Sequence, residues 1–251
     1  METIVAALGA QQAELSGLLA ELGEGDWRRP TPCDGWTVAD VVLHLAQTNE
    51  LAIGSATGRF AEVVSALTEG TGPASSVDDG AALMVARERG VAGQAVAERW
   101  QQSVEALASA LRECDPHARV VWVAGELSAR TLATTRLAET WIHTGDVATA
   151  LGVALAPSER LWHIARLAWR TLPYAFARAG RQLGGPVAFE LRAPAGDRWK
   201  FVPDSEPLTY IRGEAAELCL VAARRAEPAS TGLRGEGPDA ATVLELVRTY
   251  A

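Results

Sequence analysis

The sequence has no long apolar run and no cluster of basic residues. No stretch approaches the roughly 20 apolar residues that a membrane helix requires, and no N-terminal segment joins basic residues to a long apolar core. The net charge is -8, and Lys200 is the only lysine. Nucleic acids and anionic membranes both reward a basic patch, so the composition favours neither as a partner. We expect a cytoplasmic protein that acts on small molecules, and the sequence leaves its oligomeric state open.

Cysteine is scarce as well. Cys33, Cys114 and Cys219 are odd in number and far apart, which argues against a disulfide framework and against a four-thiolate zinc site. We therefore expect reduced thiols. Hydrophobic residues make up 48% of the 251 positions, enough for the core of one large domain or two small ones.

The first 183 residues have mostly helical spacing of apolar side chains. Thr37 and Asp40 form an expected capping box at the start of the second helix. Residues 57–80, rich in Gly, Ser and Thr, are expected to form a mobile loop around a short helix. The pattern predicts helices over residues 3–22, from Thr37 through Thr48, from Ala81 to Arg112, from Ser128 or Ala129 to Gly152, and from Pro157 to Arg181.

The pattern changes at Gly184, where short alternating segments and turn residues replace helical spacing. It predicts strands at 187–192, 198–202, 208–212 and 230–234, with helices at 214–225 and from Pro238 to Tyr250. We therefore expect a two-domain α+β protein, with a helical bundle over residues 1–183 and a small α+β domain over 184–251.

Glu139 and His143 are four residues apart within one expected helix, so their side chains share a face one turn apart. That geometry suits two ligands of one divalent metal ion. His44 is the best third ligand, because it lies about two turns into its helix on the face of Val41 and Leu45. Two imidazoles and a carboxylate leave zinc an open position, which suits catalysis.

Each of these residues has a simpler interpretation. His44 could be a hydrogen-bonded core histidine, and Glu139 with His143 could be a surface pair. Asp146 could orient His143, contact substrate as a catalytic group, or lie on a helix surface. Cys33 precedes the helix of His44, and we interpret it as a small residue packed in a turn.

Three blocks of the sequence resemble the mycothiol-dependent maleylpyruvate isomerase family of actinobacteria, within the DinB-like metalloenzymes. They are residues 31–45 (TPCDGWTVADVVLHL), 128–131 (SART) and 139–147 (ETWIHTGDV). The resemblance implies a four-helix bundle that holds a divalent metal, commonly zinc, through His44, Glu139 and His143. The second metal block resembles an uncharacterised branch of the family more closely than the isomerases themselves.

The resemblance also implies mycothiol as a thiol cosubstrate and a functional arginine in the C-terminal domain. Arg224 is the better counterpart of that arginine, and Arg225 follows it directly. Either guanidinium could hold a carboxylate of the substrate or of mycothiol by two hydrogen bonds. The alternative is an exposed arginine at the end of a helix.

Three functions are compatible with these residues. The leading hypothesis is a zinc-dependent transferase or isomerase in which a metal-bound thiolate attacks an electrophilic small molecule. The second keeps the metal without the thiol, as a lyase, hydrolase or cyclase. The third is a non-catalytic carrier of a hydrophobic ligand, which gives no reason for the spacing of Glu139 and His143.

Overall fold

The computed structural model describes residues 1–249, and the chain divides into two compact units. The first unit is Met1–Leu155 and is mostly helical, whereas the second begins at Ala156 and contains a four-stranded sheet with helices. The expected two-domain α+β class is therefore confirmed. No helix within residues 1–249 has both the length and the apolar character needed to cross a membrane.

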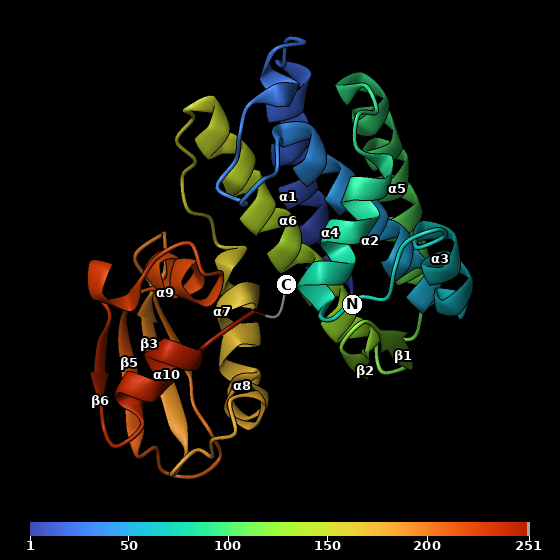
Figure 1. Ribbon diagram of the computed structural model, residues 1–251. Coiled ribbons are helices and arrows are strands. Elements are labelled where there is room, and N and C mark those ends of the chain that lie inside the picture. Colours follow the sequence, from blue (N-terminus) through green and yellow to red (C-terminus); the bar gives the residue numbers. More distant parts are fainter. Residues whose placement is uncertain (250–251) are drawn as a thin grey trace. The chain divides into compact units, whose positions relative to one another are not determined.

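Four long helices form the bundle of the first unit (Figure 1). They are α1 (Glu2–Ala20), α2 (Val38–Ala56), α5 (Gly93–Glu113) and α6 (Ala129–Leu151). Helix α1 packs on α5 and α6, and α2 packs on the same two helices, so the four enclose one core. Trp100 of α5 is 1% exposed in that core, among leucine and valine side chains of α1 and α2.

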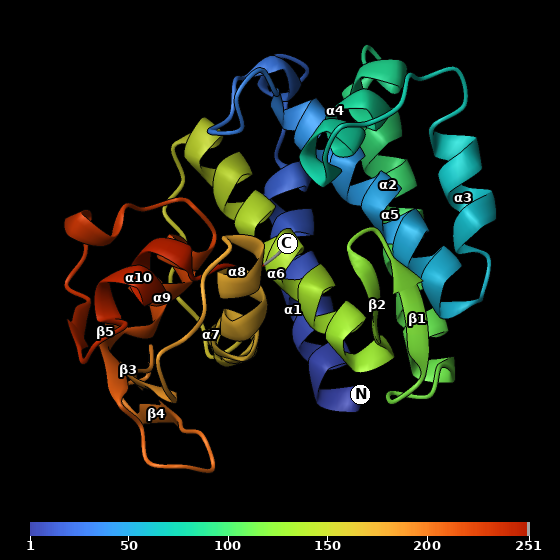
Figure 2. The ribbon, with the colours of Figure 1, turned by 60° about the horizontal axis from the view of Figure 1, so that its bottom comes forward.

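Shorter elements surround the bundle. They are the 3-10 turn η1 (Asp26–Arg28), helices α3 (Phe60–Leu67) and α4 (Val77–Glu88), and an antiparallel hairpin of β1 (Arg119–Trp122) and β2 (Gly125–Ser128). The short helix expected within residues 57–80 is confirmed as α3. The hairpin, visible beside the bundle in Figure 2, was not predicted, although it contacts both α2 and α6.

The single helix expected from Ala81 to Arg112 is wrong. The structure has two helices there, because α4 ends at Glu88 and α5 begins at Gly93. Gly90 between them has a φ of 98°, a left-handed conformation that an α-helix excludes and that glycine tolerates. A Cβ on Gly93 would lie 2.2 Å from the ring of Trp27, so the start of α5 packs directly on that indole.

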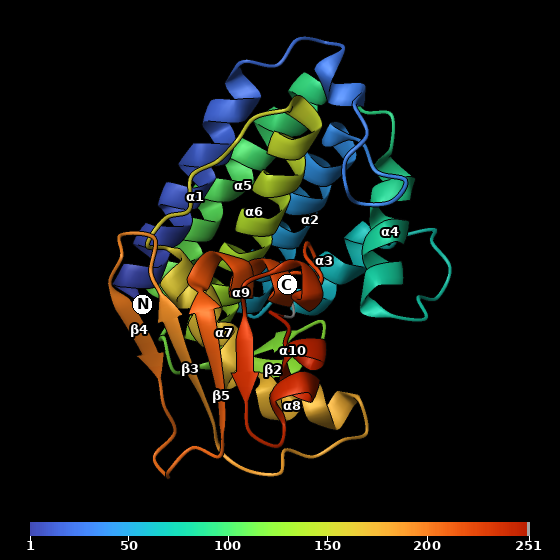
Figure 3. The same cartoon turned by 90° about the vertical axis from the view of Figure 1, so that its left-hand side faces the viewer.

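The second unit contains a mixed sheet with strand order β4-β3-β5-β6 (Figure 3). The strands are β3 (Val187–Arg192), β4 (Arg198–Phe201), β5 (Thr209–Glu214) and β6 (Arg234–Glu236). β3 pairs parallel with β5, whereas the β3–β4 and β5–β6 pairs are antiparallel. Helices α7 (Leu161–Arg170), α8 (Leu172–Arg178), α9 (Ala215–Ala222) and α10 (Ala240–Leu246) and the 3-10 turn η2 (Pro228–Ser230) complete the unit.

Two expected elements of the second unit need correction. The helix expected from Pro157 to Arg181 is interrupted at Thr171, because Pro173 lacks the amide hydrogen that a continuous helix needs. The strand expected at 230–234 is wrong. Residues 228–230 form η2 instead, and β6 begins only at Arg234.

The chain divides into its two compact units between Leu155 and Ala156, whereas the sequence places the domain boundary near Gly184. The difference arises because α7 packs on α9 and β4, which brings α7 and α8 into the second unit. The expected last helix is confirmed as α10, although it ends at Leu246, and Tyr250 lies outside the described residues.

Candidate metal centre

The capping box places His44 in the bundle. The side chain of Thr37 accepts a hydrogen bond from the Asp40 amide, and Asp40 Oδ2 accepts one from the Thr37 amide at 2.9 Å. Both interactions were predicted, and they fix the first turn of α2. His44 follows two turns later and is 7% exposed.

Helix α6 supplies the other two side chains of the centre. Glu139 is 8% exposed and His143 is 7% exposed, because α6 is buried along most of its length. His44 Nε2 lies 3.0 Å from Glu139 Oε2, and His143 Nε2 lies 3.9 Å from the same oxygen. One ligand atom of each residue lies within 4.8 Å of the others. The structure therefore brings the three side chains together at one buried point.

The three groups perturb one another. Burial alone would raise the pKa of Glu139, but the hydrogen bond with His44 and nearby positive charge lower it to about 2. Burial lowers the pKa of His44. Burial also acts to lower the pKa of His143, but the hydrogen bond with Asp146, contact with Cys33 and the charge of Glu139 raise it to about 9.

Asp146 orients His143. Its Oδ2 lies 2.9 Å from His143 Nδ1, so that nitrogen carries the hydrogen and Nε2 faces Glu139 and His44. Cys33 Sγ donates a hydrogen bond to the same carboxylate oxygen at 3.1 Å and lies 3.8 Å from His143 Nδ1. The interpretation of Cys33 as only a small residue packed in a turn misses this contact.

Trp36 lies against both imidazoles. Its ring centroid is 5.1 Å from that of His44 and 6.5 Å from that of His143. The indole is partly buried, whereas both imidazoles are buried. Trp36 therefore lies beside both proposed histidine ligands.

Arg136 was not predicted to belong to the centre. It is 1% exposed, and its guanidinium lies 3.8 Å from Glu139 Oε2. It donates a hydrogen bond of 2.8 Å to Thr48 Oγ1, and its carbon Cζ lies 5.9 Å from the ring centre of Trp122 in the hairpin. The sequence held a signal, because Arg136 precedes Glu139 by three residues and His143 by seven, on one helical face.

The residues present fit a divalent metal ion. Two imidazole nitrogens and a carboxylate oxygen are a common donor set for zinc, with a position left for an exogenous ligand. All three donors are buried, where a cation would satisfy them together. Asp146 on the far nitrogen of His143 is the outer contact that metal-binding histidines commonly have.

Arg224 and Arg225 both lie in the second unit and are exposed. Arg224 follows the end of α9 with a φ of 59°, and its guanidinium donates to the carbonyl oxygen of Glu245 at 2.8 Å. Arg225 donates to the carbonyl oxygen of Ala223 at 3.2 Å. Their expected role in binding carboxylates stays a prediction.

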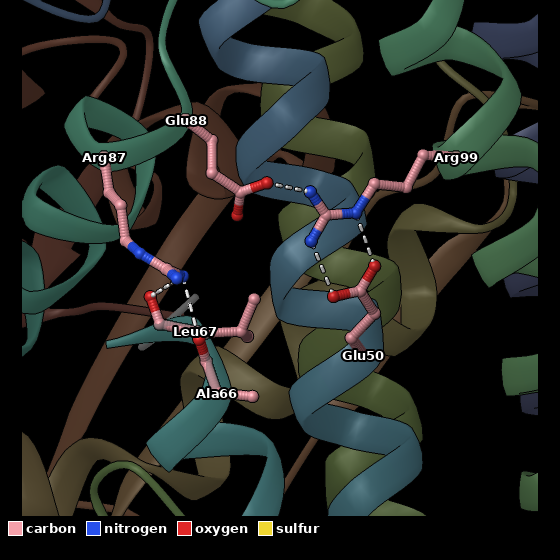
Figure 4. A pocket seen from close by; sticks show the side chains of 6 residues that line it. All are labelled: Glu50, Ala66, Leu67, Arg87, Glu88 and Arg99. Carbon is pink, nitrogen blue, oxygen red and sulfur yellow. Dashed lines mark hydrogen bonds and ion pairs between the residues drawn. The ribbon is translucent and has the colours of Figure 1, made fainter. Parts of the chain in front are cut away.

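A separate hollow lies between α2, α3, α4 and α5 (Figure 4). Arg99 contacts Glu50 through two hydrogen bonds of 2.7 and 2.8 Å and also pairs with Glu88, while Arg87 donates to the carbonyls of Ala66 and Leu67. The ion pairs of Arg99 join α5 to α2 and α4, and the hydrogen bonds of Arg87 join α4 to α3; we interpret these contacts as structural.

A family model decides the relationship of the chain to known proteins. The model of the mycothiol maleylpyruvate isomerase N-terminal domain matches residues 8–148, more than half of the chain and nearly all of the bundle. The chain belongs to this family. The resemblance found in the sequence is thereby confirmed.

Similar proteins match nearly the whole length of this chain. An uncharacterized protein of Mycobacterium tuberculosis, recorded in strains CDC 1551 and H37Rv, is 33% identical over 250 residues, which is 98% of this chain and 95% of the relative. These mycobacterial relatives support an actinobacterial branch. The crystal structure of the mycothiol-dependent maleylpyruvate isomerase has a TM-score of 0.63 at 20% identity, with 95% of each chain covered, and a mutant of it has 0.62. These two structures show that the fold is shared.

Proposed function

We propose that this protein is a metal-dependent enzyme that uses a thiol, mycothiol, to transform an electrophilic small molecule as an isomerase or transferase. One observation carries the proposal: His44, Glu139 and His143 converge within 4.8 Å at a buried point. Membership of the family, whose name includes mycothiol and an isomerase, supports the use of a thiol.

The residues of the chain have separate tasks in this proposal. His44, Glu139 and His143 would hold the ion, zinc or another divalent metal. Once bound, that ion would stabilise a thiolate at neutral pH and so supply a nucleophile. Asp146 keeps the hydrogen on His143 Nδ1 and thereby leaves Nε2 free to bind metal. Trp36 limits the access of water to the two imidazoles.

Two outcomes are open to a thiolate that attacks an activated carbon–carbon double bond. If the resulting carbanion takes up a proton from solvent and the adduct keeps the sulfur, the product is a thioether and the enzyme is a transferase. If the carbanion adduct instead rotates about the former double bond, re-forms that bond and expels the thiolate, the product is a cis–trans isomer and the thiolate is regenerated. Arg224, with Arg225, is proposed to bind a carboxylate of the substrate or of mycothiol.

Metal analysis tests the base of this proposal. Protein purified without chelator should contain close to one equivalent of metal, and His143→Ala should lose it. Thr149→Ala, an exposed position on the same helix, should keep it. Absence of metal from the unmodified protein would refute the proposal.

Calorimetry with mycothiol tests the second part. Metal-loaded protein should bind mycothiol with measurable heat, and the metal-free protein should bind it far more weakly. Metal-loaded protein that binds no mycothiol would point to the thiol-independent lyase, hydrolase or cyclase. If the protein binds a hydrophobic ligand, and substitution of all three metal residues leaves that affinity unchanged, the non-catalytic carrier would be favoured.

A further inference from the structure

The guanidinium of Arg136 is a charged group that is almost completely buried in the bundle. It is 1% exposed, and its Nε atom is buried without a hydrogen-bond partner. Burial of an ion is costly, and removal from water is offset only by close partners. Its hydrogen bond to Thr48 and its distance of 3.8 Å from Glu139 do not satisfy all five of its N–H groups.

Three elements hold this charge beside the metal residues. Arg136 lies on α6, Thr48 on α2 and Trp122 on the hairpin strand β1. Thr48 Oγ1 accepts the hydrogen bond from Arg136 and donates its own hydrogen to the carbonyl of His44 at 2.8 Å. The arginine is therefore connected to two of the three proposed ligands, to Glu139 through charge and to the backbone of His44 through Thr48.

A charge in this position affects ligands of the metal unequally. At a few ångströms and away from water, a positive charge strengthens the binding of an anion and has little effect on a neutral ligand. We propose that Arg136 makes the open coordination position select anionic ligands, thiolates and carboxylates, over neutral ones. This inference rests on the proposed function and adds a determinant of ligand class.

The competing explanation is that Arg136 only holds Glu139 in place. In that case its loss would weaken metal binding, but the ratio of anionic to neutral ligand affinity at the metal that remained would be the same as in the unmodified protein. The ratio of the two affinities therefore separates the explanations, whatever happens to the affinity for the metal itself.

The test uses full-length protein loaded with Co²⁺, whose visible absorption bands shift when an exogenous ligand binds. Thiocyanate is the anionic probe and pyridine the neutral probe, titrated at neutral pH. Arg136→Met should weaken thiocyanate binding by about tenfold or more relative to pyridine. Arg130→Met removes one exposed positive charge from the same helix and should leave the ratio unchanged.

Arg136→Lys guards against failure to fold. It keeps the positive charge, and the selection of thiocyanate over pyridine should persist in this variant. Equal weakening of both probes in Arg136→Met, or loss of the selection in cobalt-loaded Arg136→Lys, would overturn the inference. Both results require metal-loaded protein, so they differ from failure of the proposed function, which would appear as unmodified protein that binds no metal or no mycothiol.

Discussion

His143 Nδ1 lies 2.9 Å from Asp146 Oδ2, one helical turn further along α6. The pair is buried, with His143 7% exposed and Asp146 2% exposed. The aspartate therefore determines which ring nitrogen of His143 faces Glu139 and His44. The same carboxylate accepts a hydrogen bond from Cys33, in the connection before α2, so that two parts of the chain fix the orientation of one imidazole.

Asp146→Asn should weaken metal binding by about 10- to 100-fold, because the imidazole loses a charged partner that fixes its orientation and raises its basicity. Competition with a chromophoric chelator measures the change. Thr149→Ala is the matched control on the same helix. An affinity unchanged in Asp146→Asn would mean that His143 is oriented by other contacts.

Metal uptake should depend on pH, because a proton on His143 competes with the metal. The pKa of His143 in the metal-free protein is raised to about 9, so the apparent affinity should rise as the pH increases from 6.5 to about 9. Isothermal titration in buffers of different ionisation enthalpy should detect about one proton released per metal bound at neutral pH.

The stability of the metal-free protein should change in the opposite direction. A raised pKa means that protonated His143 contributes stability fully below pH 6.5, and this contribution disappears as the pH rises to about 9. In Asp146→Asn the pH range over which this stability changes should shift downward.

For the unmodified protein, a metal affinity that stays constant between pH 6.5 and 9 would contradict the expected competition between a proton and the metal at His143.

Arg99→Met should destabilise the first unit by about 2 kcal/mol, because Glu50 and Glu88 would lose a shared, partly buried counter-ion. Urea denaturation of metal-loaded protein measures this. Arg112→Met, an exposed position on the same helix, should cost much less. A double-mutant cycle with Glu50→Gln should show coupling between Arg99 and Glu50, and purely additive effects would contradict the ion-pair interpretation.

The sequence predicted those structural features that depend on residues close together along the chain. The capping box of Thr37 and Asp40 and the shared face of Glu139 and His143 follow from spacing along one helix, and both are present in the structure. The sequence placed Gly90 within a helix, because its φ of 98° depends on how α4 and α5 each pack on α2 and not on the local pattern.

Long-range contacts were the harder part. Thr48 and Arg136 are 88 residues apart, and no spacing rule links them. The same holds for Cys33 and Asp146, 113 residues apart. The family resemblance pointed to His44 as the partner of Glu139 and His143, but a resemblance carries ligand positions more readily than the buried charges around them.

The proposed ligands come from helices that are far apart in the sequence, since His44 and Glu139 are 95 residues apart. A nascent polypeptide therefore presents only one of the three proposed ligands, His44, until α6 has emerged from the ribosome and docked. Capture of the ion would then mark completed assembly of the bundle, and a truncated or misfolded copy would remain empty and inert.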